Sequence, residues 1–285
     1  MLKSNNLYLG DCLDLLAKIE DQTIDLVFLD PPYNLQLNKV LTRPNHSIVN
    51  GVNQDWDKFD SYSSYDDFTF SYLTECKRVL KPDGGLWIIG SYHNIFRIGK
   101  ILQDLNFWIL NDVIWAKSNP LPNFRATRLT NAHETLIWCS KKPKSKYQFN
   151  YHTLKVANED RQERSIWNFP ICSGKERLKN NKNQTAHPTQ KPLALMKKII
   201  IQSSIQGDLV LEPFAGTASF CAEAKYLGRN YIGFEKDEGY FNLAIKRLKK
   251  IKPLKNDLLE INEKDKPTQK IPVSYTHLTL PTNDQ

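Results

Sequence analysis

The sequence lacks a long hydrophobic run and any regular spacing of its cysteines. No stretch approaches the roughly 18 consecutive apolar residues that a membrane span needs, and the N-terminal residues MLKSN contain no apolar signal-peptide core. The five cysteines are scattered without a C-x-x-C pair, which indicates neither a zinc knuckle nor a disulfide framework. We therefore expect a cytoplasmic protein with reduced thiols and no membrane partner.

Metal-binding and phosphate-binding motifs are missing as well. Neither H-x-x-H nor H-E-x-x-H occurs, so no metal is expected, and His133 and Glu134 are assigned a structural or DNA-contacting role. No G-x-G pattern occurs either, which excludes the dinucleotide fingerprint and the phosphate-cradling loop. The cofactor is therefore expected to have no pyrophosphate.

The net charge of +8 is distributed unevenly along the 285 residues. Residues 117–191 hold 15 Lys and Arg against 5 Asp and Glu, whereas residues 1–116 hold 10 against 15. Hydrophobic periodicity fades in the middle stretch, and aromatic residues interleave with the basic ones. This pattern fits a loop-rich basic insertion that meets DNA phosphates, and a basic solvated face is the alternative.

Strand and helix patterns alternate on both sides of this stretch. Strands are expected at 7–9, 24–29, 86–89, 107–115, 135–138, 209–211 and 231–234, and helices after Asp11 and at 65–80, 95–105, 193–200, 220–227 and 241–251. The segment 81–85 is expected to end the second helix. This alternation predicts an α/β fold with a mostly parallel, doubly wound sheet, which binds ligands beyond the carboxyl ends of its strands.

The strand at 24–29 ends at the motif Asp30-Pro31-Pro32-Tyr33. The exocyclic amine of adenine is a poor nucleophile, because its lone pair is delocalised into the ring. Asp30 and the backbone carbonyl of Pro31 would accept its two N–H groups and free the lone pair, while the prolines fix both acceptors. Tyr33 offers a ring on which an extruded base stacks. We expect these four residues to be catalytic, and a simple turn is the alternative.

The strand at 209–211 ends in a second motif, Glu212-Pro213-Phe214-Ala215-Gly216-Thr217. Gly216 allows the backbone to approach a ligand, and the next helix begins there. The following strand ends in Glu235, which is suited to accept hydrogen bonds from ribose hydroxyls. A strand-to-helix turn without a ligand is the alternative.

These motifs together resemble the amino-methyltransferases of DNA, which use S-adenosylmethionine. The catalytic motif precedes the cofactor motif, which is the β-group order of that family. The closer likeness is to the CcrM and HinfI-type adenine methyltransferases, and it lies in residues 30–37, 86–96, 119–125 and 130–135. In the cofactor motif, Ala218 stands where the family usually has glycine, which puts the affinity for the cofactor in doubt.

The resemblance implies that a methyl group is transferred from S-adenosyl-L-methionine to adenine N6 in GANTC sites of double-stranded DNA. Base flipping and direct in-line transfer, without a covalent intermediate, are implied as the mechanism. A bacterial, nucleoid-associated enzyme of restriction-modification or of DNA replication is implied as well. A homodimer stays open.

The resemblance also assigns site residues. Residues 10–12 are similar to the segment that contacts the adenine of the cofactor, and residues 187–192 to the segment that contacts its methionine end. The expected cofactor-binding residues are Asp11, Cys12, Lys191, Glu212, Phe214, Gly216, Thr217 and Glu235. The expected DNA-binding residues are Asn34, Asn123, Arg125, Arg128, Lys141 and Lys142.

Two other functions stay open at this point. Cytosine-N4 methylation shares the amine chemistry but more often has serine where Asp30 stands. A catalytically silent DNA-binding module is the other alternative, and the intact catalytic motif argues against it. We expect a methyltransferase domain over residues 1–252, with the insertion at 117–191 inside it. Residues 253–285 are expected to be a disordered or artefactual tail, with the family's C-terminal DNA-binding domain missing.

Overall fold

The main feature of the fold is one large, mostly parallel sheet. The computed structural model describes residues 2–35, 41–42, 48–49, 57–123, 126–179, 183, 185–187 and 189–254. The eight strands of the large sheet have the order β1-β10-β9-β2-β5-β7-β6-β8. Only β7 among them runs antiparallel to its neighbours β5 and β6, which confirms the predicted α/β class.

The strands of this sheet are β1 (Asn6–Leu9), β2 (Ile24–Leu29), β5 (Leu80–Gly90), β6 (Trp108–Lys117), β7 (His133–Ser140), β8 (Ile166–Phe169), β9 (Leu209–Glu212) and β10 (Asn230–Glu235). A separate antiparallel pair joins β3 (Leu41–Thr42) to β4 (Ile48–Val49). The helices are α1 (Cys12–Leu16), α2 (Tyr62–Val79), α3 (Ile95–Asp104), α4 (Tyr151–Ala157), α5 (Leu193–Ser203), α6 (Ser219–Tyr226) and α7 (Glu238–Lys250), with a 3-10 turn, η2 (Gly174–Glu176).

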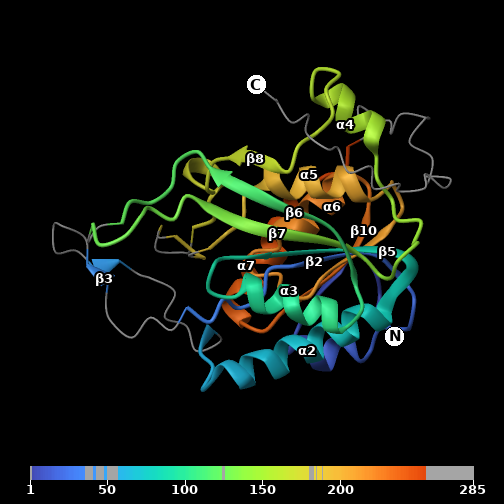
Figure 1. Ribbon diagram of the computed structural model, residues 1–285, viewed down its shortest axis with the longest axis horizontal. Helices are drawn as coiled ribbons and strands as arrows, with labels where there is room; N and C mark the ends of the chain where they lie inside the picture. The colour runs from blue at the N-terminus through green and yellow to red at the C-terminus, as the bar shows by residue number, and fades with distance from the viewer. Residues whose placement is uncertain are drawn as a thin grey trace, which may run out of the picture.

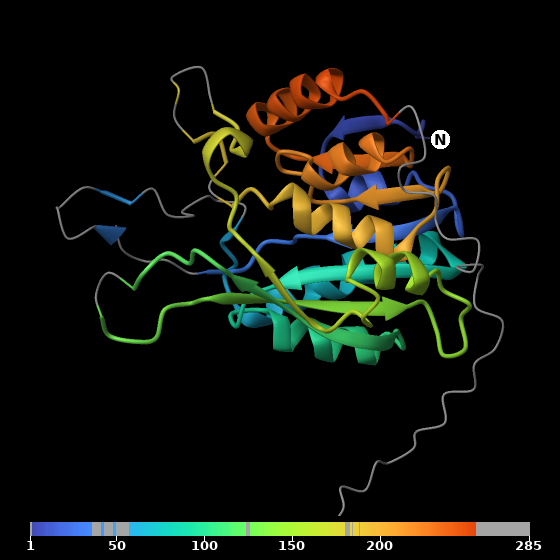
Figure 2. The same ribbon diagram turned by 90° about the horizontal axis from the view of Figure 1, so that it is seen from above.

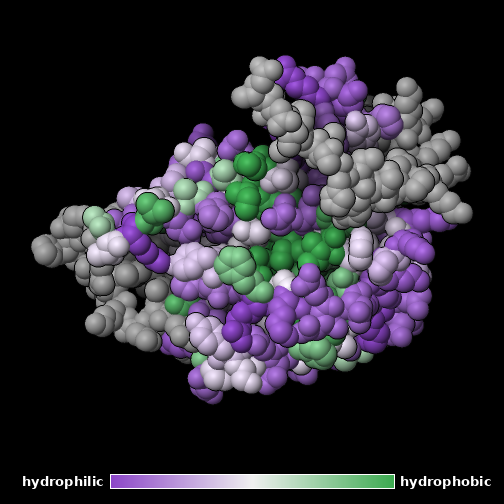
Figure 3. All heavy atoms as spheres, viewed as in Figure 1, coloured by the Kyte–Doolittle hydropathy of each residue, from purple (hydrophilic) through white to green (hydrophobic). Residues whose placement is uncertain are grey.

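Helices cover both faces of the sheet, so that the molecule has three layers. Helices α2 and α3 lie on one side and α5 and α6 on the other, as Figures 1 and 2 show. The side chains of β2 alternate between the two resulting cores: Leu26 and Phe28 pack with α5, α6 and α7, whereas Val27 and Leu29 pack with α1, α2 and α3. In Figure 3 hydrophilic side chains cover most of the visible face, and an apolar area lies near the middle of the view.

Local sequence signals explain where several helices begin. Asp11 caps α1 and accepts from the Leu13 N–H, as predicted, and Asp237 caps α7 in the same way. Ser61 and Ser64 form a reciprocal capping box at the start of α2. No described helix is long and apolar enough to cross a membrane.

The second helix ends within one residue of its expected end, but the strand that follows it begins earlier than the expected residue 86. Helix α2 ends at Val79, and β5 begins with the next residue, Leu80. Leu80 pairs with Ile24 and Gly85 pairs with Leu26, so the register shifts and β5 bulges between these pairs. The Pro-Asp-Gly run at residues 82–84 is of a kind that normally marks a turn, but here it lies within β5 at that bulge.

The basic stretch 117–191 contributes directly to the large sheet. It contains β7, α4, η2 and β8, and β7 lies between β5 and β6. Because β7 runs antiparallel, its first residues lie at the same edge as the carboxyl ends of β2 and β5. This arrangement brings part of the basic stretch to the edge where a parallel sheet binds its ligands.

Candidate active site

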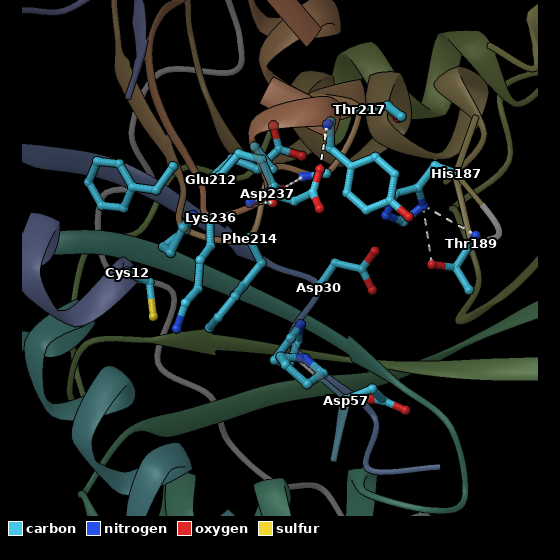
Figure 4. Close-up of a pocket in the computed structure, with 18 of the residues that line it drawn as sticks. Cys12, Asp30, Asp57, His187, Thr189, Glu212, Phe214, Thr217, Lys236 and Asp237 are labelled. Carbon is cyan, nitrogen blue, oxygen red and sulfur yellow. Dashed lines mark hydrogen bonds between the residues drawn. The ribbon is translucent and has the colours of Figure 1, made fainter. Parts of the chain in front are cut away.

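A cavity of about 660 Å³ lies beyond the carboxyl ends of the parallel strands. Four carboxylates reach it from four strand ends: Asp11 follows β1, Asp30 follows β2, Glu212 ends β9 and Glu235 ends β10. In Figure 4 the carboxyl group of Asp30 points into the space between Phe214 and His187. The volume falls within the ~300–1,000 Å³ that is typical of small-molecule sites.

The structure brings all the catalytic and cofactor-binding residues expected from the sequence to this one cavity. It is lined by Asp11, Cys12, Asp30, Pro31, Pro32, Tyr33, Lys191, Glu212, Phe214, Gly216, Thr217 and Glu235. Their individual roles stay predictions.

The loop after β2, which carries the expected catalytic motif, is held by a carboxylate that the sequence analysis missed. Asp57 accepts three successive backbone N–H groups, from Tyr33 at 2.6 Å, Asn34 at 2.8 Å and Leu35 at 3.0 Å. A turn of this kind, in which neighbouring N–H groups converge, binds an anion. The Tyr65 hydroxyl donates to the Pro32 carbonyl at 3.0 Å and holds the loop from α2.

Asp30 lies in a buried network of charges. The Lys191 ammonium is 2.8 Å from Asp30 Oδ1, and the Tyr33 hydroxyl lies 3.2 Å from the same oxygen. Burial raises the pKa of Asp30, and the nearby Lys191 opposes that rise. The same Tyr33 hydroxyl donates to Glu134 at 2.9 Å. The sequence analysis assigned Glu134 only a structural or DNA-contacting role, and no local signal links it to the motif.

Lys191 pairs with Asp30, the carboxylate expected to be catalytic. Its expected contact with the methionine end of the cofactor stays a prediction, and Lys191 lines the same cavity. Burial alone would lower the pKa of Lys191, but Asp30 and Glu134 raise it, so the side chain is a cation.

The turn between β9 and α6 is shaped by Glu235 and Gly216. Glu235 accepts from the Gly216 N–H at 2.6 Å and from the Asp237 N–H at 2.7 Å, and burial raises the pKa of Glu235 to about 7. Gly216 has φ +51°, and a Cβ there would lie 3.2 Å from His187 Nε2. The position therefore needs glycine for both its backbone conformation and the space beside it.

Two further residues of this turn, Glu212 and Ala218, are buried. Glu212 is 3% exposed and accepts from the Phe220 and Cys221 N–H groups at the start of α6, where a carboxylate stabilises a helix. Ala218 is fully buried with φ +53° and does not line the cavity. Because Ala218 does not line the cavity, it has no direct contact through which it could change the affinity for the cofactor.

Asp11 and Cys12, which follow β1, also line the cavity. Asp11 caps α1, and its second oxygen lies 3.0 Å from the Lys236 ammonium. Burial raises the pKa of Cys12 to about 12, so this residue is a neutral thiol. Within the described ranges no group of three or more His, Cys, Asp or Glu side chains is placed to hold a metal ion.

The expected DNA-binding residues are divided between both edges of the sheet. Asn123 and Arg128 lie on the β6–β7 loop at the cavity edge, where the Asn123 amide donates to the Arg128 carbonyl at 3.1 Å. The Arg128 guanidinium donates to the Tyr92 hydroxyl and lies 5.6 Å from that ring. Arg125 lies outside the described residues.

The remaining expected DNA contacts are not brought to the cavity. Lys141 and Lys142 follow β7, whose antiparallel direction places its last residues at the opposite edge of the sheet, where Lys141 donates to the Leu80 carbonyl. Asn34 is 4% exposed and has φ +53°, so its conformation explains its residue type better than a DNA contact does. On this placement we expect DNA contacts from Asn123 and Arg128 rather than from these three residues, and all of these roles stay predictions.

Comparison with known proteins agrees with this geometry. The family described as DNA methylase, N6_N4_Mtase, matches residues 24–246. Type II methyltransferase M.HinfI of Haemophilus influenzae is 50% identical over 269 residues, which are 94% of this chain and 75% of that protein. Type II methyltransferase M2.MboI of Moraxella bovis is 40% identical over 257 residues, which are 90% of this chain and 92% of that protein.

Two solved structures are similar to this chain in fold. The complex of M1.HpyAVI with S-adenosylmethionine has a TM-score of 0.61 and 28% identity over 85% of this chain and 98% of that one. PvuII DNA methyltransferase, which is cytosine-N4-specific, has a TM-score of 0.66 over 87% of both chains, but at 19% identity it shows the fold alone. The chain belongs to the DNA methylase family and is a site-specific adenine methyltransferase of DNA that uses S-adenosylmethionine.

Proposed function

We propose that the chain methylates N6 of the adenine in GANTC and that Asp30 and Tyr33 are the residues that act on this base. The observation that carries the proposal is the position of the Asp30 carboxylate, which lies in the same cavity as Phe214, Gly216 and Glu235. A base that enters this cavity reaches the carboxylate and the cofactor-binding turn together. Reaching it requires that the adenine leave the duplex stack.

Asp30 acts by accepting a hydrogen bond from the amine. Together with the Pro31 carbonyl it draws both N–H groups away from the ring plane, so that the N6 lone pair can form the new N–C bond. The loop is held by Asp57 from behind, so the acceptors are already oriented before the base arrives. Positive charge develops on N6 during transfer and is stabilised by the nearby carboxylate, and N6 then loses one proton to solvent.

The cofactor half of the cavity lies along β1, β9 and β10. When bound, S-adenosylmethionine supplies an electrophilic methyl group on a sulfonium sulfur, and the sulfur keeps the electrons of the broken C–S bond. We assign Glu235 to its ribose hydroxyls and Asp11 with Cys12 to its adenine end. Phe214 and Gly216 line the same cavity.

DNA is expected to lie across the cavity edge of the sheet. Asn123 and Arg128 lie on the β6–β7 loop there, and Arg125 belongs to the same proposed contact set although it falls outside the described residues. GANTC as the target is supported by the likeness of residues 119–125 and 130–135 to the HinfI-type enzymes. We place the methyltransferase domain at residues 1–252; the tail expected beyond it is undescribed from residue 255 onward.

The cellular setting follows from the substrate. Double-stranded DNA of a bacterium lies in the cytoplasm at the nucleoid, and we expect the enzyme to act there. The type II names of both relatives support a role in restriction-modification. Cytosine-N4 methylation is less well supported, since the N4-specific structure is similar in fold alone.

Nucleoside analysis after methylation tests this proposal. A GANTC duplex is incubated with S-adenosylmethionine and the protein, digested and analysed by mass spectrometry. We expect N6-methyladenine, and Asp30→Ala should lower turnover by about 10²–10³-fold, because it removes an acceptor that is strongest in the transition state. Affinity for S-adenosylhomocysteine should persist in that variant. N4-methylcytosine as the product, or undiminished turnover in Asp30→Ala, would contradict the proposal.

A further inference from the structure

Four charged side chains, one buried and three partly buried, form a connected group that includes both carboxylates bound to the Tyr33 hydroxyl. Asp30 follows β2, Lys117 ends β6, Glu134 lies at the start of β7 and Lys191 precedes α5. Their side chains are 6% to 18% exposed. Two carboxylates and two ammonium groups make the group neutral when all four are ionised. We call this set, with Tyr33, the acid–base cluster.

Glu134 connects both lysines of the acid–base cluster to its tyrosine. Its Oε1 lies 2.8 Å from the Lys117 ammonium. Its Oε2 accepts from the Tyr33 hydroxyl at 2.9 Å and lies 3.9 Å from the Lys191 ammonium. One carboxylate from β7 therefore reaches the tyrosine of the catalytic motif and also both lysines.

Asp30 and Glu134 compete for the same two partners. The Lys191 ammonium lies 2.8 Å from Asp30 Oδ1, and the Tyr33 hydroxyl lies 3.2 Å from that oxygen. A tyrosine hydroxyl has one proton, so it can donate a full hydrogen bond to only one of the two carboxylates. Its contact with Glu134 is the shorter one. Each interaction that Tyr33 or Lys191 makes with Glu134 leaves more of the hydrogen-bonding capacity of the Asp30 oxygens for an incoming amine.

We propose that Glu134 is a positioning residue for methyl transfer: it accepts the hydrogen bond of the Tyr33 hydroxyl and shares Lys191, which leaves Asp30 to accept the adenine amine and fixes the Tyr33 ring for base stacking. This inference rests on the proposed function. It assigns a role to a residue outside both sequence motifs. Glu134 acts through Tyr33 and Lys191 and does not itself contact the base.

The electrostatics of the acid–base cluster support this role. Burial by itself raises the pKa of Glu134, but Lys191 and Lys117 lower it overall, so Glu134 is a carboxylate. Burial and the neighbouring carboxylates raise the pKa of Tyr33 far above its usual value, so its hydroxyl keeps the proton that it donates. Loss of the Glu134 charge would leave excess positive charge where the amine itself becomes positive, and this raises the barrier.

A double-mutant cycle with single-turnover kinetics tests the proposal. The rate constant for methylation of a GANTC duplex is measured in the wild type, Glu134→Gln, Tyr33→Phe and the double variant. We expect Glu134→Gln to lower the rate constant by about 10- to 100-fold, with unchanged affinity for S-adenosylhomocysteine. The double variant should lose less than the product of the two single losses, because both changes remove the same contact.

Glu163→Gln is the matched control. Glu163 pairs with Lys198 at 2.8 Å and does not line the cavity, so its substitution removes a partly buried ion pair elsewhere and should keep the wild-type rate constant. A wild-type rate constant in Glu134→Gln, or strictly multiplicative losses in the double variant, would overturn the proposal. Should Glu134→Gln not fold, Tyr33→Phe decides alone: a reduced rate supports the proposal and an unchanged rate overturns it.

The same assay separates this proposal from the function on which it rests. A wild-type protein that methylates no adenine would overturn both. An active wild type with an unaffected Glu134→Gln would overturn the positioning role and leave the proposed function standing.

Discussion

The carboxylates that line the cavity differ in the groups that interact with their negative charge. Asp30 is paired with the Lys191 ammonium at 2.8 Å. Glu235 instead accepts the backbone N–H groups of Gly216 and Asp237. Burial raises the pKa of Glu235 to about 7, and these hydrogen bonds oppose the rise. The charge of Glu235 therefore changes near neutral pH.

Cofactor affinity should follow the charge of Glu235. A carboxylate accepts more hydrogen bonds from ribose hydroxyls than the protonated acid does. Because the pKa of Glu235 is raised to about 7, the carboxylate is present above that pH and is lost as the pH falls below it. We expect affinity for S-adenosylhomocysteine, measured by calorimetry, to weaken between pH 8 and pH 6 (about one pKa unit on either side).

Glu235→Gln provides the control for this pH dependence. It keeps the size of the side chain and removes its titration, so its affinity should be lower than that of the wild type and should change little over the same pH range. If Glu235→Gln or Glu235→Ala bound S-adenosylhomocysteine as tightly as the wild type does, the ribose site would be assigned to other residues.

Residues that act within one short motif could be predicted from the sequence, and residues that act across the fold could not. Asp30 and Glu235 each stand at the end of a recognisable strand, so their place at the sheet edge follows from the pattern. Asp57 and Glu134 reach the same loop from positions 27 and 104 residues after Asp30. Nothing in the local sequence relates them to it, since only the tertiary fold brings these side chains together.

At the scale of the element, one side chain accepts three backbone N–H groups of the loop 30–35. Asp57 accepts N–H groups from Tyr33, Asn34 and Leu35, and Asn34 adopts φ +53°, a conformation that asparagine tolerates better than most residues. The loop is therefore preorganised by a carboxylate in addition to its two prolines.

Asp57→Ala should disturb this loop. Three buried or partly buried N–H groups lose their acceptor, and each unsatisfied group costs about 1–3 kcal/mol if water does not replace the lost bond. We expect a lower midpoint of thermal unfolding and a single-turnover rate reduced by at least about tenfold. Asp66→Ala, which removes a half-exposed ion pair with Arg97, should change both quantities far less. Equal effects of the two substitutions would contradict the loop assignment.

Elements with strong periodicity were predicted closely, and those governed by pairing were not. Helix α3 and strand β2 match their expected ranges within one residue. Strand β5 begins six residues earlier than expected, because Leu80 pairs with Ile24 across a bulge that a Pro-Asp-Gly run conceals. Hydrogen-bond pairing with a distant strand, which local propensity does not encode, decides such cases.

At the scale of the whole molecule, the direction of β7 separates the basic residues into two groups. The β6–β7 loop with Arg128 extends from the cavity edge, whereas Lys142 lies beyond the other end of β7 (Figures 1 and 2). A net positive charge over residues 117–191 could be read from the sequence, but the edge at which each cation lies could not. Only the cations at the cavity edge are expected to meet phosphates.

The salt dependence of DNA binding tests this division. Each phosphate contact releases counterions, so Arg128→Ala should flatten the slope of log affinity against log salt by about one unit if that contact is to phosphate. Lys142→Ala removes the same charge at the opposite edge and should leave the slope unchanged. An equal change in both variants, measured by fluorescence anisotropy on one duplex, would show that the two edges do not differ in DNA binding.

The central claim is that this cavity methylates N6 of adenine in a defined duplex sequence. Mapping every methylated base in a plasmid after incubation with the protein and S-adenosylmethionine tests it most directly. The account predicts N6-methyladenine at the adenines of GANTC and a strongly reduced amount of it in the same reaction with Asp30→Ala. Methylation of cytosine, or of adenines without regard to sequence, would contradict it.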